Sequence, residues 1–71
     1  MKLAEVKKAI EQKLPAKYRS GVWSRSTPAG IEVGVNTKNK PGSIASLLPI
    51  DDESRPRFAE FLANEVLTKD V

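Results

Sequence analysis

A β-hairpin between Tyr18 and Thr37 is the feature that most constrains the fold of this chain. Residues 31–36 (Ile-Glu-Val-Gly-Val-Asn) alternate as a strand with one buried face does. Residues 18–26 hold Tyr, Val and Trp among small polar residues, a composition that also favours a strand. The segment between them, Thr-Pro-Ala-Gly at 27–30, has the residues that tight turns prefer. The sequence therefore predicts two antiparallel strands joined by a short turn.

The type of turn decides which way Trp23 points. A three-residue loop at 28–30, closed by Gly in a bulge, pairs Trp23 with Val35 and turns both toward the apolar side of the sheet. A slip of one residue pairs Val22 with Val35 and turns Trp23 outward, because side chains alternate between faces. The Pro and the Gly favour the first pairing. We therefore expect Trp23 to anchor the core rather than to offer a surface on which a base could stack.

Two amphipathic helices flank the hairpin. Residues 2–14 repeat apolar side chains at helical spacing, and Pro15 ends the pattern. A second helix is predicted from the acidic run at 51–53 to about Lys69, with Asp52 or Ser54 as its cap. The apolar stripes of the two helices are Leu3, Val6, Ile10 and Leu14 in the first, and Phe58, Ala59, Leu62, Ala63 and Val66 in the second.

Phe61 falls about 60° to the side of the second stripe. We expect it to cover the edge of the first helix or of the hairpin. If it is instead exposed, it becomes an anchor for a protein partner.

Residues 43–50 fit either a short third strand or one helical turn, because Ile44, Leu47 and Leu48 suit both. We favour the strand. Helices at both ends of a small antiparallel sheet most simply pack together on its apolar face. The expected fold is a single α+β domain over residues 1–71, with two layers and both helices on one face of the sheet.

This order of elements resembles the α-β-β-β-α arrangement of double-stranded RNA-binding domains, which have a similar length. Those domains place a cluster of lysines at the start of their second helix to grip phosphates. Residues 51–55 here read Asp-Asp-Glu-Ser-Arg, with the opposite charge. The resemblance implies a topology, and no site residue is carried across from it.

The sequence lacks the side chains that most catalytic sites use. It has no His and no Cys, so the commonest general base, metal ligand and thiol nucleophile are missing. The acids at 51–53 are adjacent and cannot all face one ion, so helix capping explains them better than a cation site does. We expect no catalytic residue, no metal site and no cofactor.

Size and hydropathy limit where such a chain works and how it is stabilised. The chain has 71 residues and no disulfide, so its stability has to come from one core or from self-association. A homodimer is therefore one of the expected states. No run approaches the roughly 18 apolar residues that span a bilayer. We expect a cytoplasmic protein that does not bind membranes.

Charge is distributed unevenly along the chain. Residues 1–40 hold nine Lys or Arg against three acids, a net +6, and residues 41–71 hold three against six, a net −3. A basic patch of this kind favours nucleic acid as the partner. The candidate nucleic-acid-binding residues are Lys13, Lys17, Arg19, Arg25, Lys38 and Lys40. The alternative is a protein-binding adaptor or inhibitor, of the compact kind that phages and mobile elements encode, which acts through Phe61 and an uncovered strand edge.

Overall fold

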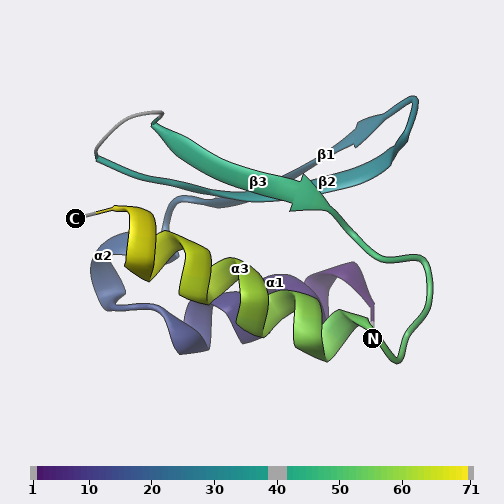
Figure 1. Cartoon of the computed structure of the whole chain (residues 1–71), viewed down its shortest axis with the longest axis horizontal. Helices are drawn as coiled ribbons and strands as arrows, with labels where there is room; N and C mark the ends of the chain where they lie inside the picture. Colours follow the sequence, from purple (N-terminus) through teal and green to yellow (C-terminus); the bar gives the residue numbers. More distant parts are fainter. Residues whose placement is uncertain (1, 39–41, 71) are drawn as a thin grey trace.

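Three antiparallel strands form one sheet, and the helices pack on one side of it (Figure 1). The computed structural model describes residues 2–38 and 42–70. Its elements are α1 (Leu3–Lys13), α2 (Ala16–Arg19), β1 (Val22–Thr27), β2 (Gly30–Asn36), β3 (Ser43–Leu47) and α3 (Arg55–Lys69). The order of strands in the sheet is β1-β2-β3. This confirms the two-layer α+β fold, with the third strand present and both long helices on one face.

The core lies between the sheet and the two long helices, where the helical stripes predicted it. The buried apolar side chains are Val6, Ile10 and Leu14 from the first helical segment, Tyr18 from α2, Val33 and Val35 from β2, Leu48 just after β3, and Phe58, Ala59, Leu62, Ala63 and Val66 from α3. Val33 and Val35 share one face of β2, so this face is the inner one. None of the helices formed by the described residues is long and apolar enough to cross a bilayer.

The pairing of β1 with β2 differs by one residue from the expected one. Val22 is opposite Val35, and Trp23 is opposite Gly34, so Trp23 lies on the outer face of the sheet. The expectation that Trp23 faces Val35 inside the core is therefore wrong. The reason is the turn: Thr27 pairs with Gly30, so only Pro28 and Ala29 connect the strands.

Thr27 stabilises this shorter turn with its own side chain. Its Oγ1 accepts a hydrogen bond from the N–H of Ala29 (3.2 Å) and donates one to the carbonyl of Gly30 (2.8 Å). Gly30 has a φ of +135°, a conformation that side-chain-bearing residues rarely adopt. Glycine is thus used as expected, but as the first residue of β2 rather than as the last residue of the loop.

Tyr18 lies in α2, and not at the start of the hairpin as expected. The side chain is buried, and its hydroxyl donates a 2.5 Å hydrogen bond to Oδ2 of Asp70, just after α3. This hydrogen bond raises the pKa of Tyr18, and burial and the charge of Asp70 add to the effect. A four-residue helix has no hydrophobic period to detect, which is why α2 was not predicted.

Asp52 or Ser54 was expected to cap α3, but the side-chain hydrogen bonds before this helix are accepted by Asp51. Ser54 occupies the cap position, but its side chain makes no capping hydrogen bond to the helix. Instead, the carboxylate of Asp51 accepts hydrogen bonds from the Ser54 hydroxyl and from the Ser54 N–H (3.1 Å). The bond from the hydroxyl is the main reason why the pKa of Asp51 lies below its usual value.

Candidate functional site

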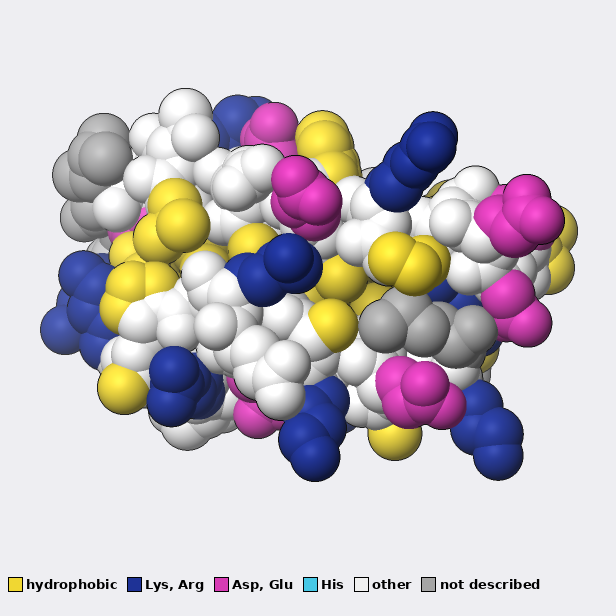
Figure 2. Space-filling model, turned by 90° about the horizontal axis from the view of Figure 1, so that it is seen from below, with side chains coloured by type: hydrophobic (Ala, Val, Ile, Leu, Met, Phe, Trp, Pro, Cys, Tyr) yellow, Lys and Arg dark blue, Asp and Glu magenta, His cyan; other side chains and the backbone are white. Residues whose placement is uncertain are grey.

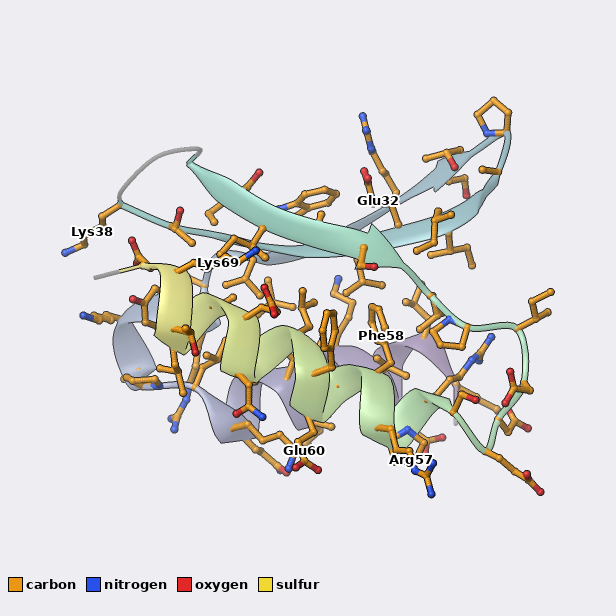
Figure 3. The ribbon with its side chains drawn as sticks, in the orientation of Figure 1. Glu32, Lys38, Arg57, Phe58, Glu60 and Lys69 are labelled. Carbon is orange, nitrogen blue, oxygen red and sulfur yellow. The ribbon has the colours of Figure 1, made fainter. Side chains whose placement is uncertain are left out.

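Four of the six predicted basic residues come from segments that meet at one end of the molecule. Lys13 is the last residue of α1, Lys17 and Arg19 belong to α2, and Lys38 follows the end of β2. Figure 1 shows α2 and the end of β2 at the left, and Figure 3 places Lys38 there. We call these four residues the basic end.

Charge is separated along the long axis of the molecule. One group of basic side chains lies at the left-hand end of the face seen in Figure 2, others are spread along it, and most of the acidic side chains lie toward the opposite end. The loop between β3 and α3, which carries the acids at 51–53, lies at that opposite end (Figure 1). The acidic residues 51–53 thus lie at the end of the molecule opposite α2.

Backbone hydrogen bonds hold α2 against the sheet at the basic end. The N–H of Gly21 donates to the carbonyl of Tyr18 (3.0 Å), and the N–H of Asn36 donates to the carbonyl of Gly21 (2.9 Å). The second bond joins the chain just after α2 to the last residue of β2. Lys38 is two residues further along the chain.

The lysines of the basic end are open to solvent. Lys13, Lys17 and Lys38 are exposed, and none of the three forms an ion pair with another described residue. The Nζ of Lys17 lies 5.1 Å from the centroid of the Tyr18 ring, which favours a defined position for this charge. Such uncompensated ammonium groups can contact phosphates without first breaking a salt bridge.

Arg19 is the one member of the basic end that is fixed by a hydrogen bond. Its Nε donates to the carbonyl of Glu11 (3.1 Å), in the last turn of α1. Carbonyl groups there are the negative end of the helix dipole, so this bond also satisfies the helix terminus. The side chain is exposed, and the other guanidinium N–H groups give it a fork suited to phosphate oxygens.

The two remaining predicted residues do not belong to this group. Arg25 lies on the outer face of the sheet, and its Nε is 2.6 Å from Oε1 of Glu32, the residue opposite it in β2. Lys40 lies outside the described residues. Arg25 is therefore separate from the basic end, because it is on a strand that runs away from α2 and is paired with Glu32.

Trp23 is the surface residue that was missed. It is half-buried on the outer face, beside Gly34, and all the helices of Figure 1 lie on the other side of the sheet. A glycine in the middle of a strand often marks a close approach of another group. Gly34 was therefore the signal in the sequence that could have placed Trp23 outward.

Phe61 is exposed to 52%, which is more than a side chain covering the edge of another element would be. Together with Arg57, Glu60 and Asn64 it lines an open hollow on α3. Arg57 and Glu60 point away from the sheet (Figure 3). Phe61 is thus available as the apolar anchor that the alternative function requires.

Comparison with protein-family models, with curated proteins and with solved structures finds no match for this chain. The predicted α-β-β-β-α order is present, with the short helix α2 added between α1 and β1.

Proposed function

We propose that the protein binds nucleic acid, and that Lys13, Lys17, Arg19 and Lys38 contact the phosphates. The observation that supports this most directly is that three separate segments bring exposed basic residues to one end. None of the four forms an ion pair with another described residue. Basic residues gathered at one end raise the local positive potential, which attracts an anionic ligand.

Contacts of this kind position a protein on a nucleic acid without reading its sequence. The acidic loop at 51–53 reinforces the effect, because a polyanion repels that end and attracts the other. Association should therefore be fast, should depend on salt and should occur in one orientation.

Reversing two charges of the basic end, in the double variant Lys17→Glu with Lys38→Glu, should weaken binding to a short oligonucleotide by at least about tenfold at low salt. Each phosphate contact contributes roughly 0.7 to the slope of log affinity against log salt for a single strand, so the slope should fall from about −3 to half that value. Fluorescence anisotropy of a labelled oligonucleotide over a series of salt concentrations measures both quantities.

The matched control is Lys2→Glu with Arg57→Glu, which has the same net charge. Arg57 lies far from α2 (Figure 3), and Lys2 directly precedes α1, next to the chain's N-terminus at that same end (Figure 1). It should lose much less affinity. Equal losses in both double variants would show that net charge alone matters. Absence of binding to any oligonucleotide at about 50 mM salt would contradict the proposal altogether.

A second candidate function, binding of a protein partner, is favoured by the exposure of Phe61. A large aromatic side chain beside Arg57 is the kind of anchor that interfaces concentrate. Phe61→Ala should then abolish capture of a partner from nuclease-treated extract, and Leu67→Ala, which removes another exposed apolar side chain of α3, should not. Equal capture by the wild type and the Phe61 variant would exclude this function for the surface.

A further inference from the structure

The indole of Trp23 lies down on the outer face of the sheet, against the backbone of β2. A Cβ atom added to Gly34 would be 2.4 Å from Cζ2 and 2.6 Å from Cε2 of Trp23, and 2.8 Å from the Cβ of Ala45. The six-membered ring therefore occupies the space that any other side chain at position 34 would fill. The strand thus supports one side of the ring.

Part of the indole stays accessible, and Arg25 lies over the ring. Trp23 is half-buried even though Gly34 beneath it is fully covered, and no helix of the described chain lies over this face (Figure 1). Arg25 is the charged neighbour: its Cζ is 5.9 Å from the centroid of the indole, and its side chain is 67% exposed. An aromatic ring and a guanidinium are the two groups on which nucleobases stack.

This ring lies close to the basic end. Trp23 is the second residue of β1, which is separated from α2 and its Arg19 by two residues, and its partner Gly34 is two residues before the end of β2. Both strands lead from the basic end directly to the ring. A nucleic-acid strand whose phosphates contact the basic end would therefore continue over the outer face, where its next bases would meet the indole.

We propose that Trp23 is a stacking platform for an unpaired base, so that the ligand of this protein is single-stranded nucleic acid. The inference rests on the proposed function and specifies its ligand. Bases within a duplex are covered on both faces by their neighbours, whereas a single strand can offer a base to the indole. Stacking needs no particular base, because every base has a π face.

Intrinsic fluorescence tests this directly, since Trp23 is the only tryptophan of the chain. The probes are oligothymidylate and oligouridylate of about ten nucleotides, within the range that small single-strand modules cover, and a blunt duplex of the same length. Either single strand should quench the emission, and the two strands show whether the ligand is DNA or RNA. The duplex should bind through its phosphates with little quenching.

Trp23→Leu should weaken single-strand binding by roughly tenfold or more and leave duplex binding unchanged. Trp23→Phe keeps an aromatic face and should recover most of the lost affinity. Leu47→Ala is the control, because Leu47 is also exposed and lies on the same outer face, opposite Glu32. Circular dichroism shows that each variant is folded, and the quenching of the wild type stands independently of the variants.

The failures of the two proposals are distinguishable. Salt-dependent binding without quenching, and with equal affinity for the Trp23→Leu variant, would overturn the stacking platform and leave the proposed function in place. If no oligonucleotide binds, both are wrong. If the emission instead shifts with protein concentration alone, a second copy of the chain covers this face, and the stacking platform is again overturned.

Discussion

Leu62→Ala should lower the free energy of unfolding by about 2–5 kcal/mol. Leu62 is completely buried between the helices and the sheet, so its truncation removes apolar contacts and leaves a cavity. A domain of this size has a total stability of only about 4–11 kcal/mol, taking about 0.05–0.15 kcal/mol per residue. The variant should therefore be partly unfolded well below the temperature at which the wild type melts, as urea titration followed by circular dichroism would show.

Phe61→Ala is the internal comparison, because the two residues are adjacent in α3. Phe61 is exposed to 52%, and its truncation should cost less than about 1 kcal/mol. If the larger loss were found for Phe61, the helix would be rotated from the orientation described here and Phe61 would belong to the core.

Gly34→Val should destabilise the protein by about 1–3 kcal/mol, although valine favours strands. Its Cβ would overlap the indole of Trp23 and the side chain of Ala45. The indole would have to leave the sheet, so the Trp23 emission should move to longer wavelength as the ring enters water. Urea titration followed by fluorescence measures both effects on one sample.

Asn36→Val provides the control for this experiment. It introduces the same residue two positions along β2, on the same outer face, where the native side chain is exposed. Its effect should be small. A Gly34→Val variant as stable as the wild type, with unchanged emission, would instead support the pairing in which Trp23 faces Val35.

The helices and their buried stripes could be predicted because the spacing of apolar residues along a short segment is enough to indicate an amphipathic helix. The stripe of Phe58, Leu62 and Val66 repeats every four residues, and each member is buried. Local spacing did not decide the third strand, because residues 43–50 fit a strand or a helical turn; the strand was favoured because a short apolar segment can extend a neighbouring sheet, and its pairing with β2 confirms it.

The pairing of the hairpin could not be fixed in this way. A two-residue and a three-residue turn both fit the Thr-Pro-Ala-Gly segment, and the choice between them inverts every side chain of β1. The deciding contacts are the hydrogen bonds of the Thr27 side chain and the close approach of Trp23 to Gly34. Both depend on three-dimensional geometry that composition and periodicity do not contain.

The basic end, too, could be predicted only in part from the sequence. The sequence supplied its lysines, but their grouping depends on α2 and on the bond between Asn36 and Gly21. Arg25 was assigned to the group because it is near Arg19 in sequence. Arg25 is instead the fourth residue of β1 and is paired with Glu32, so it does not join the residues of α2.

The hydrogen bond from Tyr18 to Asp70 joins residues that are 52 positions apart. Contacts of such long range form only when most of the chain is already in place, because closing the intervening loop costs entropy that only other native contacts repay. The position of α2, and with it the arrangement of the basic end, is therefore a property of the complete fold. Fraying of the last turn of α3 would loosen this arrangement while the sheet and the core remained intact, so affinity for an anionic ligand should decline before global unfolding begins.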